Sequence, residues 1–272
     1  MTQPAGPRMT AARLAALIAA GDTDGVRTAV AAAPRLLGAT VERDGASGWT
    51  PLHLAVVAGR ADLVADLVAA GADPAATTED GRTPLHAALE HAPHLVAVLR
   101  ELGAPVDAPS AAYLGDVPTL AARLDAGAPL RDPTTGVGLL RWAARGGSAP
   151  AARLLLGRGA DPDAAALHAA AGSGAVQVVG LLLTAGTSVD AREPDTGRTP
   201  LHTAVAAAPD GSAAEVVRRL LAAGADVDAT TTDGASALDI CRVATARLRA
   251  AGRPTAPAEE LTELLVAAGA RH

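Results

Sequence analysis

The chain is poor in the residues that normally fill a large hydrophobic core. Its 272 residues include no Phe, one Tyr, two Trp and two Ile, whereas Ala occupies 70 positions, Leu 34 and Val 22. Because Ala buries little surface and bulky aromatic side chains normally occupy thick cores, a single thick core is not expected. The composition instead favours many thin layers of small side chains.

Lysine and asparagine are absent, and all 23 positive charges are arginines. The absence of lysine excludes enzymes that need a lysine Schiff base or a phosphate-loop lysine. Cys241 is the single cysteine, which rules out an internal disulfide and a multi-cysteine zinc site and fits a reducing compartment. The net charge of -6 is spread along the chain without a basic cluster, so nucleic acid is not an expected partner.

Neither a secretion signal nor a membrane span is predicted. The apolar run Ala15 to Ala20 is too short for a signal peptide. The 26 residues between Asp163 and Asp190 carry no formal charge, but glycines, a histidine and many weakly inserting alanines interrupt that stretch. We therefore expect a soluble cytoplasmic protein with no membrane partner.

A helical pattern that ends in Gly-Ala recurs along the chain with a period of about 33 residues. Apolar residues precede each glycine at helical spacing, and a glycine can end a helix in a left-handed turn without steric cost. Before three of these units stands the tetrapeptide Thr-Pro-Leu-His, in which Thr can cap a helix and Pro can take its first position. The copies begin at Thr50, Thr83 and Thr199.

These motifs resemble those of the ankyrin repeat family, in an alanine-rich, bacterial-type form. The full unit is visible from Gly48-Trp49-Thr50-Pro51-Leu52-His53-Leu54-Ala55 to Gly71-Ala72-Asp73, and Ala166-Leu167-His168-Ala169 is a further partial copy. The resemblance implies an all-α solenoid of helix-turn-helix units with short β-hairpin fingers, comprising about seven repeats and an N-terminal helical cap. We expect a flexible N-terminal segment over residues 1–9 and a single ankyrin-repeat domain over 10–272. Within this domain we expect a helix pair over 10–43 and repeats over 44–77, 78–107, 108–132, 133–163, 164–192, 193–229 and 230–272.

Several repeats depart from the family pattern. The chain is too short for a finger before Ser110 and before Ala166, so those two repeats are expected to be truncated and weakly joined. In the fourth repeat Gly138-Leu139-Leu140-Arg141 replaces the tetrapeptide, which removes the cap and puts Arg in the place of His. An insertion over 208–214 lengthens the sixth repeat, and a helix with Glu259, Glu260 and Glu263 is expected to close the last one.

Most residues that could carry chemistry have a structural explanation. The family uses the motif histidines His53, His86 and His202 to bond neighbouring loops, which we favour over catalysis or metal binding. Pro93 breaks the helix between His91 and His94, which weakens a metal site there. Gly172-Ser173-Gly174 is expected to be a bend and Cys241 a packed thiol.

Function is therefore expected to lie in the surface. We predict a non-catalytic scaffold, a regulator, inhibitor or adaptor, which binds a partner protein, acts as a monomer and needs no cofactor, metal or small-molecule substrate. The alternatives are a self-assembling solenoid and a hydrolase or metal enzyme on a repeat scaffold. The family's finger tips and inner-helix faces line a concave groove, and aromatic and arginine side chains dominate binding hot spots. The residues expected there are Trp49, Val57, Arg82, Glu90, His91, Tyr113, Val137, Arg145 and Arg198. Trp142 is expected to lean inward.

Overall fold

Each Thr-Pro-Leu-His motif starts a helix in the computed structural model of the chain. The motif threonine is the N-cap in extended backbone, and Pro takes the first helical position, where its missing N–H needs no partner. The histidine three residues later accepts the backbone N–H of the threonine at its ring Nδ1. The three helices are α3 (Pro51–Val57), α5 (Pro84–His91) and α13 (Pro200–Ala206).

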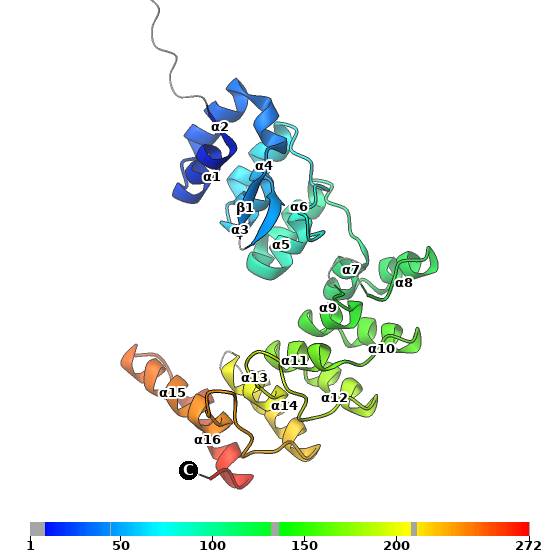
Figure 1. Cartoon of the computed structure of the whole chain (residues 1–272), viewed down its shortest axis with the longest axis vertical. Helices are drawn as coiled ribbons and strands as arrows, with labels where there is room; N and C mark the ends of the chain where they lie inside the picture. Colours follow the sequence, from blue (N-terminus) through cyan, green and yellow to red (C-terminus); the bar gives the residue numbers. More distant parts are fainter. Residues whose placement is uncertain (1–8, 44, 132–135, 208–210, 272) are drawn as a thin grey trace, which may run out of the picture. The chain divides into compact units, whose positions relative to one another are not determined.

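The structure describes residues 9–43, 45–131, 136–207 and 211–271. The chain divides into two compact units, residues 1–106 and 107–272, and each is considered by itself (Figure 1). The division falls where the sequence predicts the change from the repeat over 78–107 to the truncated repeat over 108–132. The predicted flexible segment lies outside the described residues apart from Met9, and the repeat boundaries stay a prediction.

The first unit consists of a helix pair followed by two finger-and-helix repeats. Its remaining elements are α1 (Ala11–Ala20), α2 (Thr23–Ala32), η1 (Pro34–Gly38), β1 (Val41–Arg43), β2 (Ala46–Trp49), α4 (Ala61–Ala69), η2 (Pro93–Leu95) and α6 (Val96–Glu101). The inner helices α1, α3 and α5 stack in that order. Leu14, Leu52 and Leu85 are fully buried between them, and each buried leucine contributes about 2 kcal/mol.

The first finger is a two-stranded antiparallel hairpin in which Val41 pairs with Trp49. It touches the following loop through its backbone, because the N–H of Glu79 donates to the carbonyl of Ser47 at 3.0 Å. Gly48 makes this approach possible: its φ is +89°, and a Cβ there would lie 2.8 Å from the Cα of Thr78. A larger residue would force the two loops apart.

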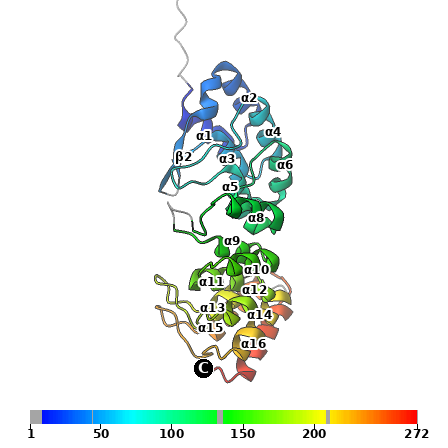
Figure 2. The same ribbon diagram turned by 90° about the vertical axis from the view of Figure 1, so that its right-hand side faces the viewer.

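The described residues of the second unit form five antiparallel helix pairs. Its remaining elements are α7 (Ala108–Leu114), α8 (Val117–Asp125), α9 (Leu139–Arg145), α10 (Ala149–Gly157), α11 (Ala164–Gly172), α12 (Val176–Thr184), α14 (Gly211–Ala222), α15 (Ala237–Ala250) and α16 (Ala256–Ala267). Within this unit Figure 2 shows α11, α13 and α15 as one layer and α12, α14 and α16 as the other. Thin Ala- and Leu-filled layers between successive pairs replace a thick core, as the composition predicts.

The two truncated repeats begin without a finger, as expected. Asp107 caps α7 and Asp163 caps α11, each by accepting a backbone N–H three residues on. Helix α9 begins at Leu139, and its N-cap Gly138 has no side chain to cap it. The end of α9 lies so close to α7 that a Cβ on Gly146 would come within 1.9 Å of the carbonyl oxygen of Tyr113.

Helix α11 is held to the repeats beside it by more hydrogen bonds than its missing finger suggested. Thr187 donates to the carbonyl of Pro162 at 2.7 Å, and Ser173 donates to that of Ala144 at 2.8 Å. Leu167 on α11 is fully buried. The weak joint predicted around 107–132 stays a prediction, and these bonds argue against the one predicted around 163–186.

The last repeat closes with the predicted acidic helix, α16. Ser236 and Asp239 form a capping box at the start of α15. Residues 208–210 of the predicted insertion lie outside the described part, and residues 211–214 belong to α14. None of the helices described is long and apolar enough to cross a membrane.

Candidate functional site

Two of the motif histidines bond the finger that follows them, as predicted. His53 reaches the carbonyl of Arg82 at 3.0 Å, and His202 reaches that of Ala235 at 3.3 Å, each through its ring Nε2. A carbonyl only accepts, so Nε2 carries the proton and Nδ1 is free to accept from the N-cap. Both rings are fully buried and serve as connectors between repeats.

Burial keeps these two rings neutral. It lowers the pKa of His53 and of His202 below the usual 6.5, because the charged form loses its hydration. The hydrogen bonds to the carbonyls of Arg82 and Ala235 act in the opposite direction without cancelling that effect. The neutral form is also the one that can donate at Nε2 and accept at Nδ1 at once.

Trp49 was expected at an exposed finger tip, and that expectation is wrong. Only 3% of the residue is exposed. Its ring packs edge-on against His53 with centroids 5.8 Å apart, and the guanidinium of Arg43 lies 5.5 Å from the ring centroid. Because Trp49 ends β2 directly before the motif, the finger turns the ring inward onto the histidine. It belongs to the core of the first unit and offers no surface for a partner.

The first unit brings three of the predicted site residues together in a charged cluster. Arg82 pairs with Glu90 at 2.7 Å and with Asp80 at 2.8 Å. The ring of His91 lies 3.8 Å from the Glu90 carboxylate and is exposed. Arg82 and Glu90 are half-buried, as is Val57. The finger and the inner helix α5 thus share one polar surface.

The second unit brings two aromatic residues together. The rings of Tyr113 on α7 and Trp142 on α9 meet edge-on, with centroids 6.4 Å apart and planes at 65°. Both residues are half-buried, so Trp142 is less enclosed than the sequence suggested. Of the other predicted residues here, Arg145 and Arg198 are exposed and Val137 is half-buried.

One constellation in the second unit superficially resembles a catalytic triad. His168 lies 2.9 Å from the hydroxyl of Thr203 and 3.6 Å from the carboxylate of Glu193, both measured at Nδ1. Its Nε2 lies 2.9 Å from the carbonyl of Ala191 and must donate to it. A triad needs its nucleophile and its carboxylate on opposite ring nitrogens. His168 therefore acts as a third connector between repeats.

The remaining chemical candidates have structural roles. Burial raises the pKa of the Cys241 thiol to about 11, which disfavours the thiolate that a nucleophile requires. His94 bonds the carbonyl of Gly59 at 3.3 Å, and α5 ends at His91 before Pro93. No group of three or more metal-ligating side chains occurs in the described part of the chain. Gly172 ends α11, and Gly174 has a φ of +69° in the bend that follows.

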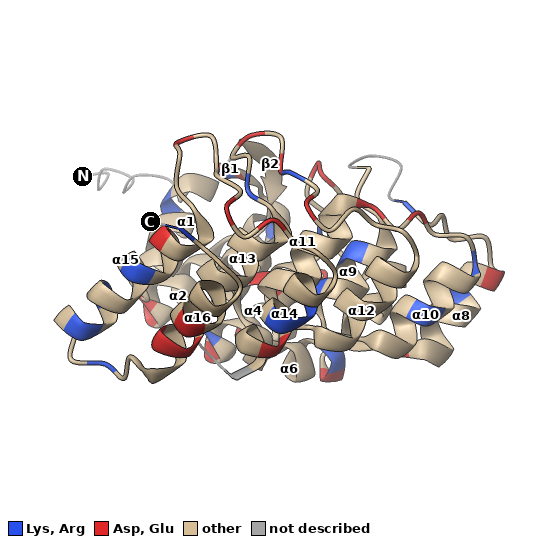
Figure 3. Ribbon diagram, turned by 90° about the horizontal axis from the view of Figure 1, so that it is seen from below, with Lys and Arg blue, Asp and Glu red and all other residues tan. Residues whose placement is uncertain are grey.

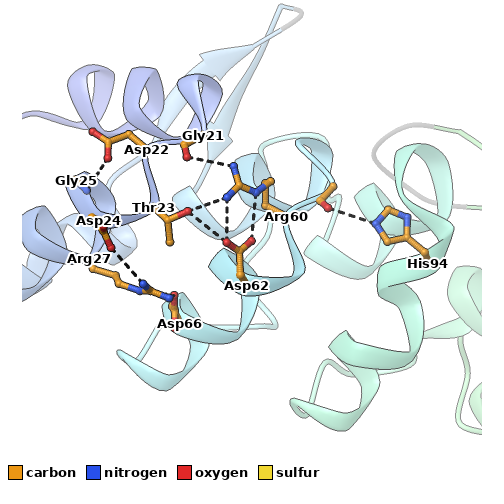
Figure 4. A network of polar contacts seen from close by, with 11 residues as sticks. Gly21, Asp22, Thr23, Asp24, Gly25, Arg27, Arg60, Asp62, Asp66 and His94 are labelled. Carbon is orange, nitrogen blue, oxygen red and sulfur yellow. Dashed lines mark hydrogen bonds and ion pairs between the residues drawn. The ribbon is translucent and has the colours of Figure 1, made fainter.

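A polar network joins the helix pair to the first repeat (Figure 4). Arg60 donates to the carbonyl of Gly21, to Thr23 and to Asp62. The Arg60 hydrogen bond holds the pKa of Asp62 down to about 2. Arg27 pairs with Asp66 at 2.7 Å across α2 and α4. These contacts connect the cap to the stack, although exposed ion pairs of this kind contribute little to stability.

Two hollows lie between outer or terminal helices. A hollow of about 280 Å³ lies between α2 and α4, with Val30 and Leu67 in its lining. A wider one of about 460 Å³ opens between α15 and α16, where Arg249 and Glu259 pair across it at 3.2 Å. The lining of the first is largely apolar, whereas that of the second also includes Arg242, Thr245, Thr262 and Glu263.

Arg141 was not among the predicted binding residues, although the sequence places it at the histidine position. It occupies the histidine position of α9, yet it is exposed, whereas His53 and His202 at the same position are buried. The finger that would cover it is missing before α11. The arginine in place of the motif histidine was the available signal, because a charged guanidinium is rarely fully buried.

Comparison with known proteins agrees with this architecture. A family model described as "Ankyrin repeats (3 copies)" matches residues 13–110 and residues 140–238, well over half of the chain. The B-cell lymphoma 3 protein homolog of Mus musculus is 32% identical over 163 residues, which are 57% of this chain and 32% of the mouse protein. The chain thus spans about a third of the length of that relative. Helix pairs that repeat with fingers between them, histidine connectors and this family match agree, and the chain belongs to the ankyrin repeat family.

Proposed function

We propose that the chain is a non-catalytic protein-binding module that uses its fingers and inner helices to hold a partner. Ankyrin repeats generally mediate protein–protein interactions. The observation that carries the proposal is the half-exposed aromatic pair of Tyr113 and Trp142 beside the exposed Arg145. The chain has three aromatic residues, and two of them lie on the neighbouring helices α7 and α9, where they remain accessible. Such side chains dominate binding hot spots.

The scaffold suits a regulator, inhibitor or adaptor in the cytoplasm. Stacked helix pairs hold their surface residues in place before binding, so little ordering free energy is lost when a partner docks. The polar cluster of Arg82, Glu90 and His91 supplies a second, hydrophilic surface in the first unit. The buried thiol and the connector histidines leave the module without a group suited to turnover.

Affinity capture with matched variants tests the proposal. The full chain is immobilised and exposed to lysate of the cells that produce it, and bound proteins are quantified by mass spectrometry and then tested as purified partners. Tyr113→Ala with Arg145→Gln should lose a partner that wild type retains. Arg153→Gln, an exposed arginine on α10, should retain it. Partner binding that is unchanged by substitutions on the fingers and inner helices of both units would contradict the proposal.

A further inference from the structure

Four residues of the second unit form a continuous surface, here called the α7–α9 face: Tyr113, Arg141, Trp142 and Arg145. Arg141 and Arg145 are exposed and stand four residues apart on α9, so they share one side of that helix. Trp142 precedes Arg145 by three residues and contacts Tyr113 of α7. The face therefore combines two guanidinium groups with an aromatic pair.

At this face an exposed residue of α9 coincides with a missing finger. In the repeats with fingers the histidine position is buried under the next loop, as at His202, whose ring bonds the carbonyl of Ala235. After α10 the chain runs through Asp161 directly to the N-cap Asp163 of α11. No finger intervenes there, and the residue at the histidine position of α9, Arg141, keeps its charge in solvent.

The electrostatics around the face are positive. Helix α9 carries Arg141 and Arg145 and no acidic residue (Figure 3 shows the arginines of α9 in blue). The neighbouring carboxylates are already paired: Asp125 with Arg158 at 2.8 Å, and Asp163 with Arg131 at 2.6 Å. Among the described residues, the Arg141 guanidinium forms no ion pair. The chain shows no basic cluster in its sequence because helical spacing is needed to bring Arg141 and Arg145 together.

We propose that the α7–α9 face binds an acidic segment of a partner protein that carries an aromatic or large aliphatic side chain. The carboxylates of the segment pair with Arg141 and Arg145, whose planar guanidinium groups suit bidentate contacts. The apolar side chain packs on the rings of Tyr113 and Trp142. This inference rests on the proposed function and specifies the partner class.

The surroundings favour a short acidic peptide over a nucleic acid. The chain carries a net charge of -6, and the later fingers of the same unit present Glu193, Asp195 and Asp233. A polyanion that extended past the face would be repelled by these carboxylates, because nucleic-acid binding draws on many phosphate contacts at once. Two arginines and an aromatic pair are enough for a short peptide.

A titration with defined peptides tests the proposal. The probe is a fluorescein-labelled peptide of about twelve residues, rich in Glu with one central Phe and one Leu. Two counterparts replace every Glu by Gln or by Lys. Binding is followed by anisotropy, and the fluorescence of Trp142 reports the location. The Glu peptide should bind most tightly, and its affinity should fall as salt is raised.

Variants separate the face from the general charge of the protein. Arg141→Gln with Arg145→Gln should weaken the Glu peptide about tenfold or more, and Arg153→Gln, which removes the same kind of charge from α10, should change it less than about twofold. Trp142→Phe should remove the fluorescence response. Circular dichroism melts confirm that each variant is folded, which the exposure of the three arginines favours.

Several outcomes overturn the inference. Equal affinity for the Gln peptide, tighter binding of the Lys peptide, or an equal effect of Arg153→Gln would each exclude an acidic segment at this face. Tighter binding of polyuridylate than of the Glu peptide would assign the face to nucleic acid. If no Glu peptide binds while the captured partner still depends on Tyr113 and Arg145, the inference fails and the proposed function stands.

Discussion

The position that holds histidine in the motif is packed differently in the first unit and at the start of the second. In the first unit a finger covers the histidine position, so His53 is buried and bonds the carbonyl of Arg82. At the start of the second unit this position holds Ser110, a buried hydroxyl with no partner among the described residues, and then the exposed Arg141. A finger thus supplies the hydrogen-bond acceptor for the ring, but burial does not require one, because His86 before the fingerless repeat is also buried.

The largest expected effect comes from the close approach between the end of α9 and α7. Gly146→Ala would place a Cβ within 1.9 Å of the Tyr113 carbonyl oxygen, which is backbone and cannot move aside. We expect the second unit to lose about 3 kcal/mol or more, at the upper end for overpacking. Urea denaturation monitored through Trp142 measures it. A loss below about 1 kcal/mol would show that α7 and α9 can separate without cost.

The second prediction contrasts the two histidine positions directly. His53→Ala removes the bond to Arg82 and the ring contact with Thr50, so the first unit should lose about 1–3 kcal/mol. Arg141→Ala removes an exposed side chain and should change the second unit by less than about 0.5 kcal/mol. Denaturation of both variants, with Trp49 and Trp142 as separate reporters, measures the difference. Equal losses would mean that the finger does not distinguish the two positions.

The third prediction concerns pH. The pKa of His53 in the folded chain lies below 6.5, so between these values the unfolded state binds more protons. Stability is complete above about pH 6.5 and falls as the pH drops toward the folded-state pKa, by at most about 1.4 kcal/mol per pH unit. His202 adds the same trend in the second unit. Hydrogen exchange should show the repeats around these rings loosening first.

The control for the pH effect lies in the chain itself. Residues 107–145 contain no histidine, so protection of α7 and α9 should respond to acid only through their neighbours. His53→Asn should flatten the pH dependence of the first unit. A slope that survives this substitution would assign the acid response to carboxylates instead.

The smallest expected effect is an increase in the stability of the second unit. Gly157 ends α10 with ordinary helical geometry, and a Cβ there meets no atom within 4 Å. Gly157→Ala should stabilise the second unit by about 0.4–1 kcal/mol, because alanine restricts the unfolded chain. Thermal melts compared with Gly146→Ala test it. Destabilisation by both alanines would show that the Gly146 effect does not arise from its contact with Tyr113.

Local chemistry made much of this fold predictable. The threonine caps, the helix-ending glycines and the missing fingers before Ser110 and Ala166 all follow from short-range rules, and the structure confirms them. The direction of Trp49 did not follow, because it depends on how the finger folds back onto His53. The exposure of Arg141 was not predicted either. A short sequence motif does not show how such side chains pack against the neighbouring repeat.

The two tryptophans also give the chain a built-in pair of optical reporters. Trp49 lies in the core of the first unit, and the half-buried Trp142 belongs to the second unit. A single-tryptophan variant that keeps one or the other reads the melting of its own unit alone. The melting curves followed by tryptophan emission in the two variants would coincide if the units melt together. They would have different midpoints if each unit melts independently. The aromatic scarcity of this sequence thus makes the cooperativity between the two units directly measurable.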